Sequence, residues 1–283
     1  MNIRQIPEGA PRFVPSVPSE SSTRRVIVGV AQRYVEEDGA PVRAGESLFG
    51  EELDLLEDDG AFMRVRTRLD GYVCLIDRDH VSEEIIAPTH YVSVPHTIAT
   101  EGPASRTKEV MYLGMTSPVK VVDTCEENNT VCVQDAGWVS KHHVREINDF
   151  FPDFVDVGYM FLGRPYFHGG RTGIRLDCSA LWQNALLASG RWAPRTALEQ
   201  REYLGVPVPL EEQESLRRGD FVFWSGHEAV MYDSLHVLHS VGYVKAVALE
   251  PLREVIARRR SEPQENKREI IAIKRLPDYV PRF

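Results

Sequence analysis

The sequence predicts an α+β protein in which two small all-β domains precede a larger domain of helices and antiparallel strands. Three observations lead to this prediction. Short runs of alternating apolar and polar residues, separated by Gly turns, fill residues 25–147. Helical patterns appear only after these runs, and strand-like runs follow the helices. With 283 residues, the chain can bury one sizeable core and one or two small ones.

Residues 1–24 are predicted to form an extended arm without a core of its own. Four prolines and a cluster of serines interrupt any regular pattern there: Pro7, Pro11, Pro15 and Pro18, with Ser19, Ser21 and Ser22. The first all-β domain is expected at residues 25–88 and the second at 89–147, where the alternating runs resume.

A weak internal repeat relates the two all-β domains. Residues 71–73 (GYV) resemble 137–139 (GWV), and residues 79–81 (DHV) resemble 142–144 (HHV). Small repeated units of this size resemble a pair of bacterial SH3-like barrels.

The pattern changes in the last predicted domain, residues 148–283. Residues 150–162 and 178–189 are predicted helices, and Gly190 is a stop signal after the second. Strands are expected at the runs FVFW, EAVMY, LHVLHSV, KAVALE and IIAIKRL. Helices followed by an antiparallel sheet favour an α+β domain over a parallel, doubly wound one.

Charge and composition exclude several classes of function. A formal net charge of −9 argues against a partner that is a nucleic acid or an anionic membrane, because both attract Lys and Arg. No run of 18 apolar residues and no apolar leader is evident, so a cytoplasmic location is expected. The four cysteines form no CxxC pair and are expected to be thiols. Four residues could be considered as zinc ligands, but their spacings are not those of known zinc sites: Cys125, Cys132, His142 and His143. No cofactor or metal is therefore expected.

Cys178 is the candidate nucleophile. Asp177 is a good N-cap, which places Cys178 in the first turn of the predicted helix. Free backbone N–H groups and the helix dipole favour an anion there, so the pKa of Cys178 is expected to be lowered toward or below neutrality. The alternative is that Cys178 is a small apolar residue on the buried face of that helix.

Two histidines in the run WSGHEAVMYDSLHVLHSV are the candidate base and its orienting partner. If residues 232–234 form the loop of a hairpin, Met231 pairs with Leu235 and His227 lies directly opposite His239. Both imidazoles then share one face of the sheet. A nucleophile at a helix start, a base on a strand and an orienting group on the next strand form the arrangement of a cysteine hydrolase.

Other residues of this hairpin are given smaller roles. His236 is expected on the opposite face, without a part in the chemistry. Glu228 is interpreted as a surface or sheet-edge charge, because neighbouring residues of a strand face opposite ways. A two-residue loop would instead slip the register by one residue and place Glu228 opposite His239.

These motifs together resemble the NlpC/P60 cysteine peptidases across residues 150–283. The matching segments are FLGRPYFHGGRTGIRLDCSALWQNAL, PRTALEQ, RRGDFVFW, GHEAVMY and LHS, in the order that the family shows. A papain-like α+β fold is therefore implied. Two preceding SH3-like barrels resemble the family's cell-wall-recycling members. Those enzymes are γ-D-glutamyl-L-diamino acid endopeptidases that cleave small murein peptides with a free N-terminal L-Ala.

The resemblance also implies roles for single residues. The catalytic trio would be Cys178, His227 and His239, and Tyr166 would lie near the oxyanion. The resemblance implies that Asp177 and Ser179 bind the free amine of the substrate. It also implies that Glu51 and Tyr72 of the first all-β domain narrow the cleft. Asp177 has the alternative role of a plain helix cap, and Tyr72 that of a turn aromatic in the barrel core. Arg195 and Gln200 are expected to position the loop and helix near the cleft.

The sequence departs from the family pattern around the trio. His168 replaces the usual Trp, Ala180 replaces Gly, Glu228 replaces Val, and Ala197 replaces a substrate-binding Ser; the segment 43–48 is also short. These departures leave two other hypotheses open. One is a binding module with a degenerate peptidase fold, and the other is an amidase or acyltransferase that acts on a different amide.

Overall fold

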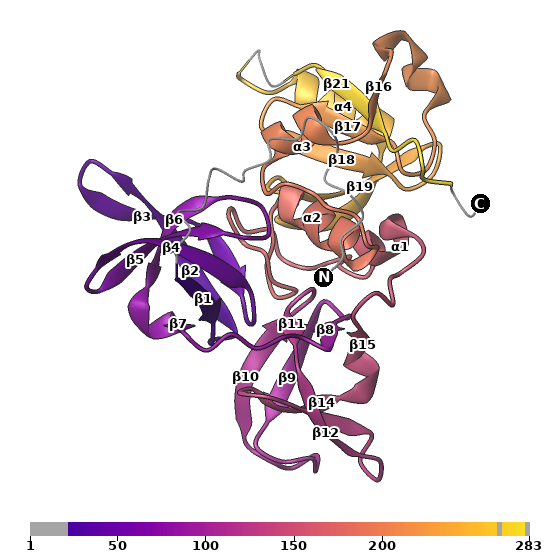
Figure 1. Cartoon of the computed structure of the whole chain (residues 1–283). Coiled ribbons are helices and arrows are strands. Elements are labelled where there is room, and N and C mark those ends of the chain that lie inside the picture. The colour runs from indigo at the N-terminus through magenta and orange to yellow at the C-terminus, as the bar shows by residue number, and fades with distance from the viewer. Residues whose placement is uncertain (1–21, 265–267, 281–283) are drawn as a thin grey trace. The chain divides into compact units, whose positions relative to one another are not determined.

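The computed structural model describes residues 22–264 and 268–280, which belong to two compact units (Figure 1). Unit 1 contains residues 22–150 and 169–174, and unit 2 contains residues 151–168, 175–264 and 268–280. The predicted N-terminal arm lies outside the described residues as far as residue 21. Its last residues, Thr23 and Arg24, already belong to the first strand.

The N-terminal part of unit 1 is one antiparallel sheet in the order β3-β2-β6-β5-β4-β1-β7. Side chains alternate between buried and exposed along strands such as β5, as expected for a sheet with one apolar face. Val26, Leu53 and Val65 are among the buried residues of its core. The strands are β1 (Thr23–Val26), β2 (Val30–Glu37), β3 (Ala40–Leu48), β4 (Glu52–Asp59), β5 (Phe62–Thr67), β6 (Val73–Asp77) and β7 (Val81–Ser82).

The rest of unit 1 forms a five-stranded sheet, β10-β9-β14-β13-β12, and a three-stranded sheet, β11-β8-β15. Val92, Leu113 and Val139 contribute to their shared core. The strands are β8 (His90–Val92), β9 (His96–Thr100), β10 (Glu109–Gly114), β11 (Pro118–Val119), β12 (Val121–Cys125), β13 (Thr130–Val133), β14 (Gly137–Ser140) and β15 (Val144–Glu146). The predicted all-β character of this region is confirmed; its SH3-like type and the domain boundaries stay predictions.

The internal repeat corresponds to a repeated piece of backbone. Gly71 and Gly137 both have positive φ, 74° and 108°, and each comes just before or at the start of a strand, β6 or β14. Each strand then runs into a one-turn 3₁₀ helix, η1 (Arg78–His80) or η2 (Lys141–His143), followed by a short strand. A Cβ atom at Gly137 would lie 2.5 Å from the Thr100 carbonyl oxygen, so this position requires glycine.

Unit 2 is an α+β domain, as predicted. Its antiparallel sheet has the order β16-β21-β17-β18-β19-β20. The strands are β16 (Val206–Val208), β17 (Phe221–Trp224), β18 (His227–Met231), β19 (His236–Val241), β20 (Ala246–Pro251) and β21 (Ala272–Arg275). The helices are α1 (Phe154–Tyr159), α2 (Cys178–Ala188), α3 (Ala197–Tyr203), the 3₁₀ helix η3 (Leu210–Ser215) and α4 (Leu252–Arg260).

Two of these helices correspond to predicted ones, and α4 was not predicted. Along the described stretches of the chain, none of the helices combines the length and apolarity needed to cross a lipid bilayer.

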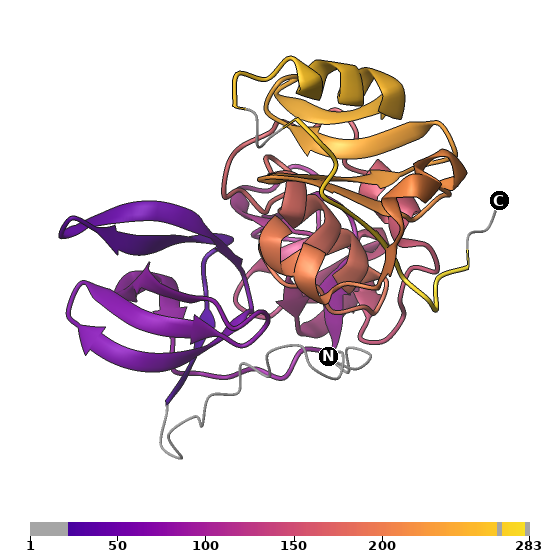
Figure 2. The same ribbon diagram turned by 90° about the horizontal axis from the view of Figure 1, so that it is seen from above.

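Helices cover both faces of the sheet in unit 2 (Figure 2). On one face, Phe221 of β17 packs between Phe154 of α1 and Trp182 of α2, with ring centroids 5.7 and 6.0 Å away. On the other face, Val255 of α4 joins a buried cluster that includes Trp224. The sheet therefore has a face covered by α2 and a face covered by α4.

The hairpin of β18 and β19 differs from the prediction by two residues. Met231 pairs with Val237, not with Leu235, and the Tyr232 N–H donates to the His236 carbonyl, 2.8 Å away. In this register His239 lies diagonally across from His227. Because the shift is an even number of residues, both imidazoles still share one face.

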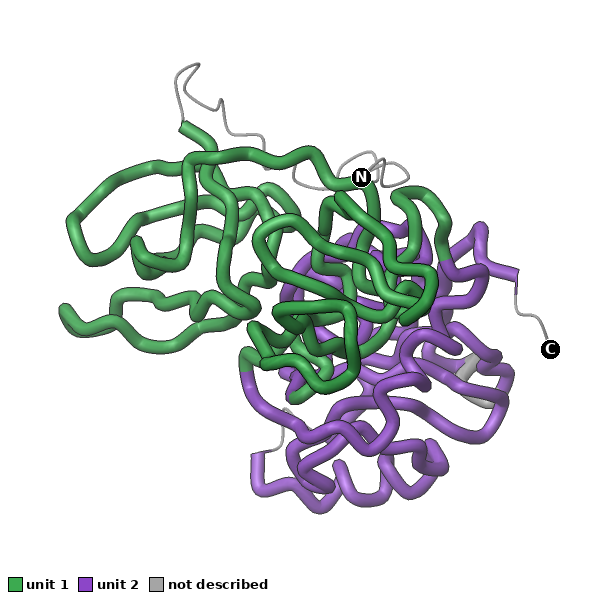
Figure 3. The backbone as a smooth tube through the Cα atoms, turned by 90° about the horizontal axis from the view of Figure 1, so that it is seen from below, with its two compact units in different colours: residues 1–2, 11–150, 169–174 green, residues 3–10, 151–168, 175–283 purple. Residues whose placement is uncertain are grey.

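The segment 169–174 interrupts unit 2 in sequence and packs within unit 1 (Figure 3). Arg171 is fully buried there, and its N–H donates to Glu46 Oε2 at 2.7 Å while its guanidinium pairs with Glu51. Gly173 lies so close to the Pro95 carbonyl oxygen that a Cβ atom would approach it to 2.0 Å. This segment is thus fixed by buried charges and by a glycine that allows close backbone approach.

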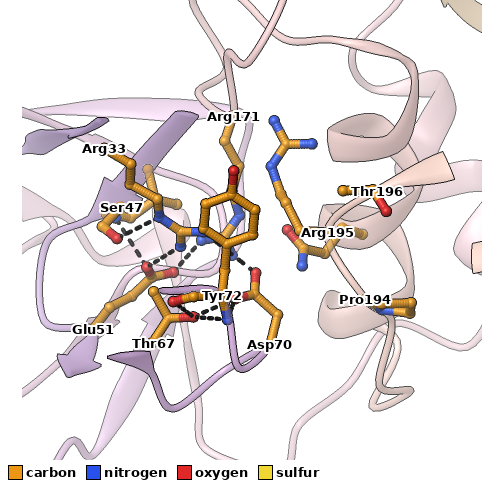
Figure 4. Close-up of polar contacts among 12 residues, drawn as sticks. Arg33, Ser47, Glu51, Thr67, Asp70, Tyr72, Arg171, Pro194, Arg195 and Thr196 are labelled. Atoms are coloured by element: carbon orange, nitrogen blue, oxygen red, sulfur yellow. Dashed lines mark hydrogen bonds and ion pairs between the residues drawn. The ribbon is translucent and has the colours of Figure 1, made fainter. Parts of the chain in front are cut away.

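The Arg171 cluster extends into the first sheet (Figure 4). Arg33 lies 3.6 Å from Glu51 Oε2 and 3.5 Å from Asp70 Oδ2, and its Nε donates to Ser47 Oγ at 2.8 Å. All of these side chains are buried. Removing one partner would leave charges without compensation in a place that water does not reach.

We therefore expect Arg171→Ala to lower the free energy of unfolding by about 3–5 kcal/mol, because Glu51 would lose the buried guanidinium with which it pairs. Urea denaturation followed by circular dichroism measures this change. Arg106→Ala, which removes an exposed guanidinium, is the control and should change stability by less than about 0.5 kcal/mol. Equal effects of the two substitutions would contradict the importance of the cluster.

Candidate active site

The start of α2 is built as the sequence predicts. Asp177 is the N-cap in an extended conformation, and its Oδ1 accepts the Ala180 N–H at 2.9 Å. Cys178 is consequently the first residue of the helix, with 8% of its surface exposed. The predicted cap and the position of the candidate nucleophile are both confirmed.

Asp177 has a second partner besides the helix. Arg195 holds both of its oxygens, with Nη2 2.8 Å from Oδ2 and Nη1 3.0 Å from Oδ1. The same Nη1 donates to Ser179 Oγ at 3.1 Å. Gln200 of α3 donates to the carbonyl oxygens of Ser179 and Pro194, both 2.9 Å away. Arg195 and Gln200 thus position the loop and helix beside the nucleophile, as expected from the sequence.

The sulfur of Cys178 lies beside the start of β18. The backbone N–H of Glu228 is directed to it and favours the thiolate. This N–H is available because β18 and β19 pair only at Val230 with Leu238 and Met231 with Val237. The strands are therefore open where they pass the nucleophile.

The ionisation of Cys178 differs from the prediction. Burial raises the pKa of its thiol, and the carboxyl groups of Asp177 and Glu228 raise it further. The Glu228 N–H and Arg195 oppose this change without cancelling it. The expected lowering of the pKa is wrong for the free site, because desolvation and two neighbouring acids outweigh the helix start. The thiol is protonated at neutral pH and needs a base.

His227 and His239 form a direct hydrogen bond. His227 Nε2 and His239 Nδ1 are 3.0 Å apart, and both rings are buried. The other nitrogen of His239, Nε2, lies 2.8 Å from Glu250 Oε2 on β20. Arg258 of α4 completes the chain, with two nitrogens 2.7 and 2.9 Å from the Glu250 oxygens. Glu250 was not predicted as a site residue.

This chain determines which nitrogen carries each proton. Arg258 and His239 lower the pKa of Glu250 to about 2, so Glu250 is an acceptor. His239 Nε2–H must then donate to Glu250, and His239 Nδ1 must accept from His227 Nε2–H. In this tautomer the unprotonated nitrogen of His227 is Nδ1, which makes no hydrogen bond to the protein within the described part of the chain. His227 is therefore presented as a base through Nδ1.

The charge state of His227 also suits a base. Burial lowers its pKa well below the usual value, and His239, Arg259 and Arg258 lower it further. An imidazole that is neutral at pH 7 can accept a proton from a thiol. The pKa of His239 is lowered by burial as well, although Glu250 opposes the change.

The side chains of Glu228 and of the two histidines lie on opposite faces of the sheet. Glu228 pairs with Phe223 and shares its face with Phe221, the face covered by α2. His227 and His239 point to the face covered by α4. Among the described residues no hydrogen bond joins Cys178 to His227, and both residues lie beside the stretch where β18 and β19 are not paired.

Glu228 is a buried residue, which corrects the interpretation of it as a surface or sheet-edge charge. It is 0% exposed, and neither carboxyl oxygen has a hydrogen-bond partner within the described residues. Burial raises its pKa well above the usual value; Asp177 raises it further and Arg195 opposes this. A carboxyl group whose ionisation is disfavoured by burial therefore lies beside Cys178, where the family pattern has Val.

A pocket of about 290 Å³ opens on the α4 face beside the histidines. Tyr166 lines it, and the Tyr166 N–H donates to the Lys245 carbonyl oxygen at 2.9 Å. Burial raises the pKa of Tyr166 to about 12, and Cys178 and Asp177 contribute to this shift. The phenol is thus protonated and lies close enough to Cys178 to feel its charge, and its role at the oxyanion stays a prediction.

The remaining predicted residues lie elsewhere or have other partners. Glu51 is buried and already pairs with Arg171 and Arg33, which competes with binding of a substrate amine. Tyr72 lies over Arg33, with the guanidinium carbon 5.8 Å from its ring centroid. Their roles toward a substrate stay predictions. His168 is exposed, Ala180 is buried within α2, and Ala197 begins α3.

Comparison with known proteins agrees with this geometry. Residues 163–261 match the NlpC/P60 family. Dipeptidyl-peptidase 6 of Lysinibacillus sphaericus is 24% identical over 239 residues, which cover 77% of this chain and 87% of that protein. The γ-D-glutamyl-L-lysine dipeptidyl-peptidase of Bacillus subtilis (strain 168) is 33% identical over 112 residues, 37% of this chain and 36% of the relative's length.

A similar solved structure covers most of the chain. An NlpC/P60 family protein from Bacillus cereus ATCC 10987 superimposes with a TM-score of 0.71 and 18% identity, over 90% of this chain and 99% of that one. This similarity shows a common fold. The fold of unit 2, with a cysteine at a helix start and a hydrogen-bonded histidine pair on a sheet, defines a cysteine peptidase of the hydrolase class. The chain carries an NlpC/P60 domain.

Glu228→Gln tests the buried carboxyl group. Because the pKa of Glu228 is raised in the folded state, the wild-type protein should lose stability as pH rises above the unfolded value near 4.5. The variant has no such proton to lose. Its melting temperature relative to wild type should therefore increase between pH 4.5 and pH 8, as calorimetry would show. A difference that is independent of pH would contradict the assignment of a neutral Glu228.

Glu250→Gln tests the hydrogen-bond chain. An amide cannot enforce the Nε2–H tautomer of His239, so kcat/KM should fall by about 10- to 100-fold, part of the usual contribution of acid–base catalysis. Glu250→Asp, which keeps the charge, should lose less. Peptidase assays across pH measure both effects; full activity of Glu250→Gln at every pH would exclude this role.

Proposed function

We propose that this protein is a cysteine endopeptidase that hydrolyses the bond between γ-D-Glu and a diamino acid in murein peptides with a free N-terminal L-Ala. The name of the Bacillus subtilis relative, a γ-D-glutamyl-L-lysine dipeptidyl-peptidase, supports this substrate class. The observation that carries the proposal is the chain Glu250–His239–His227, which presents an unprotonated imidazole nitrogen on the strand that also meets Cys178.

Acylation would begin with proton transfer from the Cys178 thiol to His227 Nδ1. The sulfur then attacks the γ-carbonyl carbon and forms a tetrahedral intermediate. His227 returns the proton to the nitrogen of the diamino acid, the C–N bond breaks, and a thioester remains. Water, deprotonated by His227, hydrolyses the thioester and restores the thiol.

The developing oxyanion requires hydrogen-bond donors close to the sulfur. The backbone N–H of Cys178 is free of helical bonding because it lies in the first turn of α2. The hydroxyl group of Tyr166, which the raised pKa keeps protonated, is the second proposed donor.

The free amine of the substrate would bind beside the nucleophile. Asp177 and Ser179 flank Cys178, and their oxygens already gather around Arg195. We propose that the ammonium group of L-Ala adds to this cluster as a second cation on Asp177. The role in recycling of cell-wall peptides, in the cytoplasm, belongs to the same proposal.

Products identified by mass spectrometry test the activity. The wild-type protein should release L-Ala-γ-D-Glu from murein tripeptide and tetrapeptide, and Cys178→Ala should release none, because no other described thiol lies at a helix start next to an imidazole pair. Cys132→Ala is the matched control and should retain activity. Wild-type turnover by Cys178→Ala would overturn the proposal.

A binding module that does not cut is the second candidate. The raised pKa of Cys178 favours it, since the free site holds a thiol and not a thiolate. The same peptides separate the two candidates: tight binding without products supports the binding module. An amidase or acyltransferase would accept N-acetylated peptides, which the proposed enzyme should reject.

A further inference from the structure

We propose that Arg259 of α4 forms a binding subsite for a carboxylate group of the substrate, next to the histidine pair. This inference rests on the proposed function and adds a specificity-determining residue to it. Neither the sequence motifs nor the comparisons with known proteins assign a role to α4 residues.

Arg259 lines the same pocket as the catalytic histidines. Its neighbours around this space of about 290 Å³ include His227, His239 and Tyr166. Arg259 is also close enough to the nucleophile that the charge of Cys178 acts on its pKa. A substrate with its scissile carbonyl at Cys178 would therefore extend toward this guanidinium.

The surroundings of Arg259 leave its charge poorly compensated. Its side chain is 13% exposed, and the nearest carboxylate, Glu262, is 4.0 Å away and 37% exposed. The guanidinium lies over the ring of Trp224, 5.6 Å from the centroid. Burial lowers the pKa of Arg259, with Glu262 opposing the change. Burying a cation in this way costs free energy, which a bound anion would offset.

The charge of the neighbouring Arg258, on the same helix, is fully compensated by a carboxylate. Both of its terminal nitrogens hold Glu250, which in turn holds His239. Arg258 is thus committed to the hydrogen-bond chain. Arg259, one residue further, has no comparable partner among the described residues and faces the pocket.

The proposed substrate carries two carboxylates near the scissile bond. The γ-linked D-Glu keeps its α-carboxylate within a few bonds of the scissile carbonyl, and the released diamino acid has its own carboxylate next to the leaving amine. A guanidinium group binds a carboxylate with two parallel hydrogen bonds. Either carboxylate fits this chemistry, so the experiment must distinguish them.

Three peptides serve as probes: L-Ala-γ-D-Glu-L-Lys, the same peptide with the D-Glu α-carboxylate converted to an amide, and the same peptide with the Lys carboxylate converted to an amide. Arg259→Met should lower kcat/KM about 10- to 100-fold on the unmodified peptide, mainly through KM. The loss should vanish on one amidated peptide, which identifies the carboxylate that Arg259 binds, and persist on the other.

Arg260→Met is the matched control. Arg260 lies next to Arg259 on α4, but its side chain is 65% exposed and it does not line the pocket. The control removes the same charge and should change kcat/KM less than about 2-fold on every peptide. Arg259→Lys, which keeps the charge, should recover part of the affinity. Melting temperatures verify that the variants fold.

Binding measurements separate this inference from the proposed function. In the Cys178→Ala background, calorimetry should show weaker binding of one amidated peptide, and Arg259→Met should abolish that difference even if the wild-type protein cleaves nothing. Equal losses on all three peptides, no loss on any, or no carboxylate preference in binding would overturn the subsite.

Discussion

The proposed chemistry depends on one hydrogen-bond chain, from Arg258 through Glu250 and His239 to His227. The ladder between β19 and β20 places His239 opposite Ala248, so Glu250, two residues along, projects on the same face. Because the Glu250 carboxylate can only accept a hydrogen bond, His239 and then His227 each have one tautomer available. The histidine pair therefore keeps one arrangement of protons, and Arg258 of α4 contributes by fixing the position of the Glu250 carboxylate.

The free site favours the protonated thiol of Cys178, the proposed nucleophile. Cys178 lies at a helix start that favours an anion, yet burial and the carboxyl groups of Asp177 and Glu228 favour the thiol. Desolvation outweighs the helix start in the free site, so the proposed mechanism begins with proton transfer from the thiol to His227. A protonated sulfur also resists oxidation better than a thiolate does.

Local patterns in the sequence predicted a large part of this arrangement. The cap at Asp177, the helix that begins with Cys178, and the Gly71 and Gly137 repeat all depend on neighbouring residues. The hairpin register was off by two residues, and the shared face of His227 and His239 survived because side chains alternate with a period of two.

Glu228 was interpreted as a surface charge because only tertiary packing buries it. Glu250 was not predicted because its partners, His239 and Arg258, come from other elements of the fold. The helix α4 was not predicted because its four arginines obscure the apolar spacing of Leu252, Val255 and Ile256. Seven residues before the nucleophile, Arg171 is embedded among side chains of the N-terminal sheets. Neither compact unit is therefore encoded by one uninterrupted stretch of sequence. A fragment that contained residues 151–283 alone would therefore hold Arg171 without Glu51, the carboxylate that compensates its charge.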